Sequence, residues 1–122
     1  MPAKARTSAN QAKTRLRIYH GERIALGPGK VELLSRIGAT GSISEAARQM
    51  DMSYNRAWLH IQDINKSFKT PLVASLRGGN AGGGAALTDT GKQVLALYQQ
   101  LEAEAQAATK ATWTQIQELL KS

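Results

Sequence analysis

The sequence predicts a mostly α-helical fold with a little β structure, in which a small domain is followed by a long C-terminal helix. Three observations lead to this expectation: two amphipathic helices joined by a short corner within residues 41–68, a glycine-rich loop between short apolar segments within residues 72–87, and apolar residues repeating at spacings of three and four after residue 88. A chain of 122 residues with 42% hydrophobic content can build one modest core.

Residues 41–68 predict two helices that meet at a tight corner at Asp51-Met52. Ser44 and Ser53 are expected to cap these helices, because a serine hydroxyl at a helix start can accept a hydrogen bond from an unpaired backbone N–H. The small pair Ala46-Ala47 would allow the two helices to cross closely.

The second of these helices has the pattern of a recognition helix. Its apolar stripe consists of Ala57, Trp58, Ile61, Ile64 and Phe68, and we expect Trp58 to lie in the core. Its other face carries hydrogen-bonding side chains concentrated toward the N-terminal end: Ser53, Asn55, Arg56, His60, Gln62 and Asp63. Such a helix suits the major groove of DNA. Pairs of amphipathic helices also occur in proteins that never contact DNA, so this motif alone leaves the function open.

A β-hairpin and a helix are expected before this motif. Residues 14–26 alternate in polarity around a turn at Gly21-Glu22, with Ile24 and Leu26 facing inward on the returning strand and a basic exposed face. Pro28 opens a helix that ends at Thr40-Gly41 and completes a three-helix core.

After the motif, residues 72–87 predict a wing, which is a strand, a glycine-rich loop and a second strand. Five of the eleven glycines lie between Arg77 and Gly84. A nucleotide-binding P-loop is excluded, because this loop lacks the required lysine and leads into a strand rather than a helix.

A long helix capped by Thr88 is expected within residues 89–122, running from about Asp89 to Ala108 and resuming through Trp113–Leu120. Its apolar seam resembles a heptad repeat, and we assign the following residues to dimerisation: Val94, Tyr98, Leu101, Ala105, Ala108 and Leu119. Thirty helical residues extend roughly 45 Å, further than a three-helix core can cover, so a second copy of the chain is the expected partner. The alternative is a helix packed back on its own domain.

Composition and charge narrow the function class. The formal net charge of +7 is concentrated before residue 88, where thirteen Lys and Arg residues outnumber five Asp and Glu residues. This asymmetry favours a polyanionic partner for the domain and a protein partner for the helix. The sequence contains no cysteine and no cluster of metal ligands, so no metal or cofactor is expected. Residues 1–13 carry no apolar run, and we expect a disordered basic arm and a cytoplasmic protein without a membrane segment.

The order of these motifs resembles the N-terminal DNA-binding domain of the molybdate-responsive regulators (ModE), which is similar to the LysR-type winged helix. The resemblance covers about Arg15 to Glu104 and depends on three groups of residues: Gly41-Ser42-Ile43-Ser44 with Ala46-Ala47, Met52-Ser53-Tyr54 with Ala57-Trp58, and Gly78-Gly79, Gly82-Gly83-Gly84 and Leu87-Thr88 with Gly91. Asp51 stands in the corner where a glycine is more usual. The resemblance implies a bacterial, homodimeric winged helix-turn-helix protein on an inverted-repeat operator. The resemblance implies that members which sense molybdate carry C-terminal oxyanion-binding domains, and since the sequence ends at Ser122 we do not expect molybdate control from these residues.

We therefore expect a basic arm (residues 1–13), a winged helix-turn-helix domain (14–88, with hairpin 14–26, helix-turn-helix 42–68 and wing 72–87) and a dimerisation helix (89–122). The expected contacts with double-stranded DNA come from Ser42, Ser44, Arg48, Ser53, Tyr54, Asn55, Arg56, His60, Arg77 and Asn80. Arg56 and Asn55 are the expected base readers, because arginine suits guanine and asparagine suits adenine.

The predicted function is sequence-specific transcription regulation, possibly of molybdenum- or metal-related genes, and not catalysis, because no nucleophile stands beside an evident activator. Two alternatives stay open. One is a nonspecific, architectural DNA-binding protein of the same fold. The other is an oxyanion-binding or interaction module in metal homeostasis, in which Ser42, Thr88 and the wing amides would hold the anion.

Overall fold

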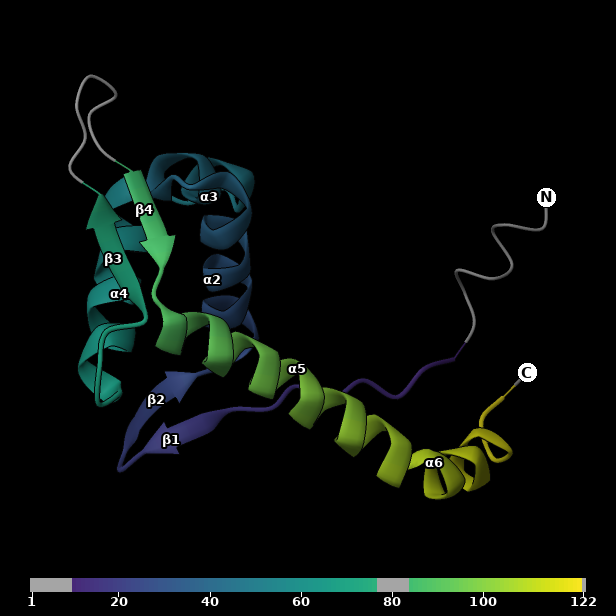
Figure 1. The fold of residues 1–122 in the computed structure, drawn as a ribbon. Coiled ribbons are helices and arrows are strands. Elements are labelled where there is room, and N and C mark those ends of the chain that lie inside the picture. The colour runs from purple at the N-terminus through teal and green to yellow at the C-terminus, as the bar shows by residue number, and fades with distance from the viewer. Residues whose placement is uncertain (1–9, 77–83, 122) are drawn as a thin grey trace. The chain divides into compact units, whose positions relative to one another are not determined.

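The computed structural model describes residues 10–76 and 84–121 and confirms a mostly α-helical winged helix-turn-helix fold. Residues 15–99 form one compact unit, and residues 1–14 with 100–122 form a second. The elements follow the chain in the order shown in Figure 1: β1 (Ile18–His20), β2 (Arg23–Leu26), α2 (Pro28–Thr40), α3 (Ile43–Gln49), α4 (Tyr54–Ser67), β3 (Val73–Leu76), β4 (Gly84–Leu87), α5 (Asp89–Ala108) and α6 (Lys110–Gln117).

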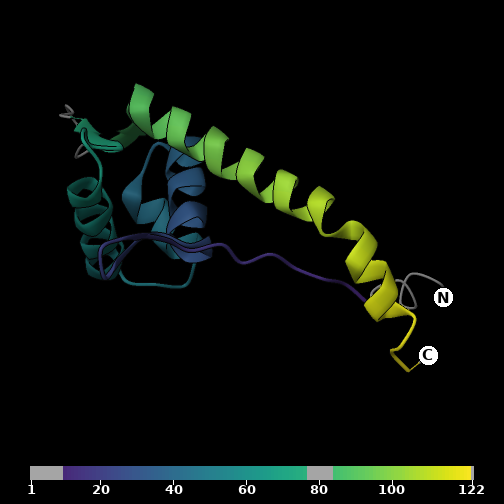
Figure 2. The ribbon, with the colours of Figure 1, turned by 90° about the horizontal axis from the view of Figure 1, so that it is seen from below.

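The core of the first unit lies between α2, α3 and α4, which Figures 1 and 2 show gathered together. Helix α2 starts at Pro28 and ends at Gly41, which has a φ of 70° that favours glycine. Ala46 and Ala47 are buried, as their expected place at a close helix crossing requires. The buried apolar side chains of this core are Leu26, Leu33, Leu34, Ile37, Ala46, Ala47, Ala57, Ile61, Ile64, Leu72, Val73, Ala85 and Tyr98.

The caps of the helix-turn-helix differ from the prediction at one residue. Ser42, not Ser44, caps α3, because its hydroxyl accepts the Glu45 N–H at 3.0 Å. The prediction of Ser44 was wrong because α3 begins two residues earlier than its apolar face suggests. The predicted cap at Ser53 is confirmed by its 3.0 Å bond from the Arg56 N–H.

The corner between α3 and α4 depends on Asp51. This residue has a φ of 56° and is the only non-glycine residue with positive φ in the described part of the chain. Aspartate tolerates this left-handed conformation better than most residues. The geometry therefore explains how the corner forms without a glycine.

Trp58 was expected in the core, and this prediction was wrong. Its side chain is 40% exposed, whereas Ala57, Ile61 and Ile64 are buried. Successive residues of an α-helix point roughly 100° apart, so the residue that follows Ala57 lies at the edge of the buried stripe. Spacings of three and four alone do not distinguish the edge of a stripe from its centre.

The N-terminal hairpin contains a bulge, and as a result Ile24, which was expected to face inward, is exposed. Ile18 pairs with Leu26 and Tyr19 pairs with Ile24, so a bulge leaves Ala25 without a partner. Ala25 and Leu26 are both buried, whereas Ile24 is 37% exposed and not inward-facing as expected. The hairpin still attaches to the core, through Leu26.

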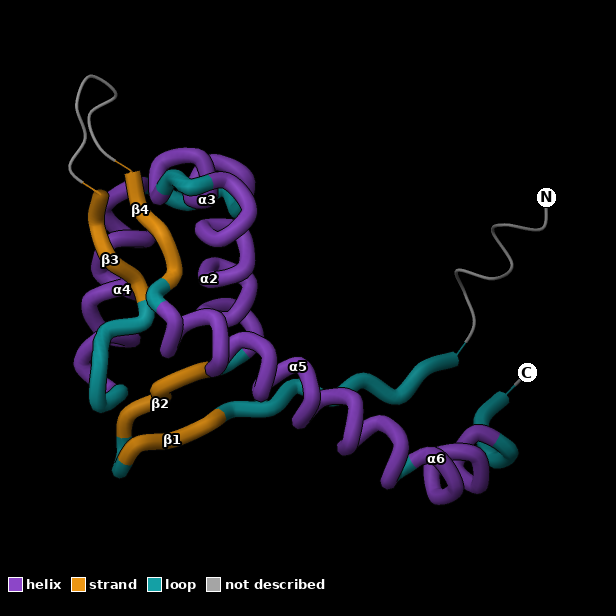
Figure 3. The backbone as a smooth tube through the Cα atoms, in the orientation of Figure 1, coloured by secondary structure: helices purple, strands orange, loops and turns teal. Residues whose placement is uncertain are grey.

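The wing is the second of two separate antiparallel pairs of strands (Figure 3). Val73 pairs with Leu87 and Leu76 pairs with Gly84. The Asn65 side chain of α4 holds the start of β3, accepting from the Leu72 N–H at 2.8 Å and donating to the Val73 carbonyl at 3.1 Å. The wing is therefore fixed to the recognition helix by hydrogen bonds.

Helix α5 begins as expected, with the Thr88 hydroxyl accepting the Gly91 N–H at 2.9 Å. Two residues that were predicted to line the dimer seam, Val94 and Tyr98, instead pack on the core of their own domain. Tyr98 is 2% exposed and donates a 2.6 Å hydrogen bond to the Leu16 carbonyl, and Val94 packs against the same core. A side chain already buried in its own chain has no surface left for a partner, so the assignment of Tyr98 to dimerisation was wrong.

Candidate nucleic-acid interface

Helix α4 presents an exposed face near its N-terminus. Asn55 and Arg56 are exposed, and Leu59, four residues after Asn55, is 54% exposed. Residues at spacings of three and four share a helix face, so the predicted base readers and Leu59 form one surface. Sequence reasoning missed Leu59, because a single apolar residue on a polar helix face does not reveal whether it is exposed.

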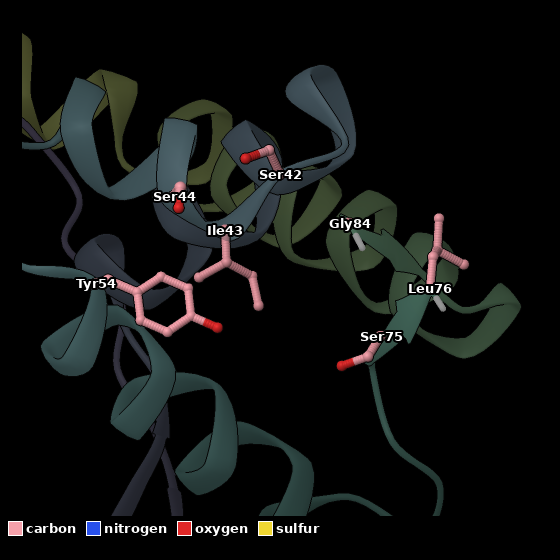
Figure 4. Close-up of a pocket in the computed structure, with 7 residues that line it drawn as sticks. All are labelled: Ser42, Ile43, Ser44, Tyr54, Ser75, Leu76 and Gly84. Carbon is pink, nitrogen blue, oxygen red and sulfur yellow. The ribbon is translucent and has the colours of Figure 1, made fainter. Parts of the chain in front are cut away.

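A small cavity of about 170 Å³ lies where α3, α4 and the wing meet. Figure 4 shows the Tyr54 and Ser75 hydroxyls pointing toward the space between them. The described residues that line it are Ser42, Ile43, Ser44, Tyr54, Ser75, Leu76 and Gly84. Three predicted contacts, Ser42, Ser44 and Tyr54, therefore come together here, and Ser75 is a further hydroxyl that sequence reasoning missed. We call this the wing-side cavity.

Arg48, another predicted contact, is exposed on α3 and paired within its own helix. Its guanidinium binds both carboxylate oxygens of Glu45, one of them through Nε at 3.1 Å. The hydrogen bond to Arg48 lowers the pKa of Glu45 and raises that of Arg48. The pair reduces the net positive charge that α3 presents, so Arg48 would have to exchange Glu45 for a phosphate.

A larger cleft of about 390 Å³ lies between α4, the start of α2 and the N-terminal hairpin. Its charged or titratable lining consists of Arg15, Arg17, Lys30, Arg56 and His60, and no carboxylate among the described residues lines it. We call this the hairpin-side cleft. It brings Arg56 and His60 together, and it shares no lining residue with the wing-side cavity.

Lys30 is fixed in the wall of this cleft. Its side chain is 15% exposed, and its Nζ donates to the Ile24 carbonyl at 2.8 Å and lies 3.7 Å from Asp63. Arg23 lies 4.0 Å from the same Asp63 carboxylate. Burial first, then the charges of Lys30 and Arg56, lower the pKa of His60, which Asp63 offsets only in part.

The remaining predicted sites fall into two groups. Arg77 and Asn80 lie outside the described residues. Of the predicted dimerisation residues, Leu101 is 40% and Leu119 86% exposed, while Ala105 is half-buried and Ala108 exposed. These four lie in the second unit, where α5 gives way to α6 at Thr109.

Of the residues suggested for an oxyanion, the amides of the wing loop 77–83 lie outside the described residues, and Ser42 and Thr88 do not line the same cavity. Ser42 lines the wing-side cavity, but Thr88 does not, and the Thr88 hydroxyl is already bonded to the Pro71 carbonyl at 2.7 Å as well as to Gly91. Among the residues that the structure describes, no group of three or more potential metal ligands occurs. No helix in residues 10–76 and 84–121 is both long and apolar enough to cross a bilayer.

Comparison with known proteins relates this fold to bacterial regulators. The chain is 46% identical over 78 residues to the molybdenum-pterin-binding protein MopB of Rhodobacter capsulatus, covering 64% of this chain and 29% of that protein. It is 42% identical over 84 residues to the molybdenum transport protein ModE of Azotobacter vinelandii, covering 69% and 31%. It is 35% identical over 88 residues to the DNA-binding transcriptional dual regulator ModE of Escherichia coli K12, covering 72% and 34%.

The matched region spans only about a third of the length of these relatives. The predicted resemblance to ModE proteins is thus confirmed for the DNA-binding region. Residues 29–92, from the start of α2 into α5, match the family described as bacterial regulatory helix-turn-helix protein, lysR family. This match covers more than half of the chain, which therefore belongs to the lysR family of bacterial regulatory helix-turn-helix proteins.

Proposed function

We propose that the chain is a sequence-specific DNA-binding transcription regulator that acts as a homodimer on an inverted-repeat operator of molybdenum-related genes. The observation that carries the proposal is the exposed face of α4, where Asn55, Arg56 and Leu59 lie together on the second helix of a helix-turn-helix. The names of the relatives MopB and ModE connect proteins with such a domain to molybdenum-pterin binding and molybdenum transport.

Each residue on this face has a distinct expected role. Arginine can donate two hydrogen bonds to guanine, and asparagine can make a bidentate pair with adenine. Leu59 can make apolar contact with a thymine methyl group. Ser42, Ser44 and Tyr54, together in the wing-side cavity, would contact the backbone and set the register of α4 in the groove.

The dimer is proposed from the exposed apolar side chains of the second unit. Leu101, Ile116 and Leu119 are all at least 40% exposed, and none of the residues of α6 is buried. Pairing about a two-fold axis would place the two α4 helices about 34 Å, or a multiple of that, apart on DNA. An inverted repeat is the operator symmetry that follows.

The test is selection of binding sites from a random DNA library, followed by affinity measurements on the selected and a scrambled duplex. A regulator should prefer its site by about 10³-fold or more. Equal affinity would identify the architectural alternative.

Arg56→Ala should then cost roughly 1–3 kcal/mol on the selected site and relax the choice of base at one position. Lys66→Ala is a matched control, because it removes one positive charge from the exposed last turn of the same helix. If Arg56→Ala weakens selected and scrambled DNA equally, Arg56 is a phosphate contact and its role as a base reader is wrong.

A further inference from the structure

We propose that the hairpin-side cleft binds a backbone phosphate of DNA, so that the N-terminal hairpin acts as a second wing on the opposite flank of α4 from β3–β4. This inference rests on the proposed DNA-binding function and extends it. The cleft is a site apart from the wing-side cavity, because the two share no lining residue.

The cleft has the charge that a phosphate needs. Arg15, Arg17, Lys30 and Arg56 each contribute a full positive charge to its lining. Asp63, beside the cleft, is shared between Lys30 and Arg23 and does not neutralise the arginines. Four cations held around one concave surface of about 390 Å³ repel one another until an anion enters.

Two of these cations are free to bind a ligand. Arg15 and Arg17 are exposed, and neither has an ion-pair partner within residues 10–76 and 84–121. This differs from Arg36 and Arg48, whose guanidiniums are bonded to Glu32 and Glu45. Guanidinium groups are well suited to phosphate, because their planar donors match its oxygens in pairs.

DNA, rather than a free anion, is the source of phosphate that the geometry favours. Arg56 belongs both to the lining of the cleft and to the exposed face of α4. A helix docked in the major groove has sugar–phosphate backbone along both of its flanks. Any duplex that α4 contacts through Arg56 therefore brings phosphates to the mouth of this cleft.

The protonation of His60 provides a second way to detect phosphate binding in the cleft. The groups that face it are Lys30 from α2, Arg56 and Asp63 from α4, and the hairpin-side arginines Arg15 and Arg17. A bound phosphate would offset these positive charges and raise the lowered pKa of His60, so binding would take up a proton. DNA affinity should consequently increase as the pH falls toward and below the ordinary histidine pKa of about 6.5, because the pKa of His60 in the free protein lies below that value.

The experiment compares the full chain with Arg15→Gln/Arg17→Gln on a mixed-sequence duplex over a series of salt concentrations. The control is Arg36→Gln/Lys92→Gln, which removes the same formal charge from positions that line neither cavity. One lost phosphate contact per chain should reduce the salt slope by about 0.9 and the affinity roughly tenfold at 0.1 M salt. The control should leave the slope within error of the wild type, and thermal melting should show all three proteins folded.

Three results would overturn the inference. The first is an equal slope for Arg15→Gln/Arg17→Gln and wild type, with wild type still bound to DNA. The second is a pH dependence of affinity that persists unchanged in His60→Gln. The third is saturable binding of inorganic phosphate to the cleft without DNA, followed through the His60 ring resonances, with no change in DNA affinity in the arginine variant. Failure of the wild type to bind any duplex would instead refute the proposed function.

Discussion

The two units of the chain use their apolar side chains in opposite ways. In residues 15–99, leucine, isoleucine and alanine side chains from three helices and both hairpins close over one another, and Leu34, Ile37 and Ile64 are 0% exposed. In the second unit, Leu119 is 86% and Ile116 51% exposed, and α6 buries none of its residues. A closed core stabilises a domain by itself, whereas exposed apolar side chains at helical spacing are stabilised only when another surface covers them.

The largest expected effect comes from placing charges among the exposed apolar side chains of the second unit. Leu101→Glu/Leu119→Glu places charges on the exposed seam and should convert a dimer to a monomer in sedimentation, without changing the melting of the domain. Apparent affinity for an inverted repeat should fall by roughly 10²–10⁴-fold, because the second half-site loses its high effective concentration. Gln99→Glu/Gln117→Glu adds the same charges at exposed positions off the seam and should remain dimeric. If the wild-type protein is a monomer at micromolar concentration, the hypothesis that two chains pair along these residues is wrong.

A substitution that disrupts packing in the core of residues 15–99 should instead lower the free energy of unfolding of that domain. A Cβ added at Gly91 would meet the Leu72 carbonyl oxygen at 2.2 Å, and this neighbour is backbone that cannot rotate away. We expect Gly91→Ala to cost about 3 kcal/mol of the domain's stability in urea unfolding, at the upper end of overpacking effects. Gly29→Ala is the control, since a Cβ there meets nothing within 4 Å. Equal unfolding midpoints for the two variants would contradict the close approach of α5 to the start of β3.

Trp58 belongs to the domain with the closed core, but its own side chain is partly exposed to solvent. Because it is 40% exposed, Trp58→Ala should cost only about 1–2 kcal/mol of stability, compared with about 3–5 for a buried tryptophan. Thermal unfolding measures this difference. Ile64→Ala, at a 0% exposed position of the same helix, should be the more destabilising substitution. The reverse order would place Trp58 in the core after all.

Leu59 provides the smallest and most specific test. If it contacts a thymine methyl, replacing that thymine by uracil in a selected site should cost about 0.8 kcal/mol, the value of one buried methyl-sized group. The cost should vanish in Leu59→Ala, which a double-mutant cycle of binding affinities measures directly. An undiminished cost in Leu59→Ala would show that another side chain reads the methyl.

Several features of the fold and site could be predicted from residues alone because they depend on local chemistry. Ser53 caps α4, Gly41 ends α2 and Thr88 caps α5, since each action involves only neighbouring backbone groups. The apolar spacing in α4 correctly predicted Ala57, Ile61 and Ile64 as core residues. The motif order predicted the family for the same reason, because a helix-turn-helix and its wing are contiguous in sequence.

The sequence by itself thus determined the helices, the caps at Ser53 and Thr88, the two hairpins and the polar front of α4, all of which follow from contacts within a few residues. Only the tertiary structure decided that Trp58 stands at the edge of its stripe, that a bulge turns Ala25 inward in place of Ile24, and that Tyr98 reaches back to Leu16 rather than outward. The hairpin-side cleft is another such feature, since Arg17 precedes β1 while Lys30 and Arg56 belong to α2 and α4. The physical reason is that burial and the convergence of charges depend on which segments meet in space, and a periodic pattern along one segment carries no information about the segment that will cover it.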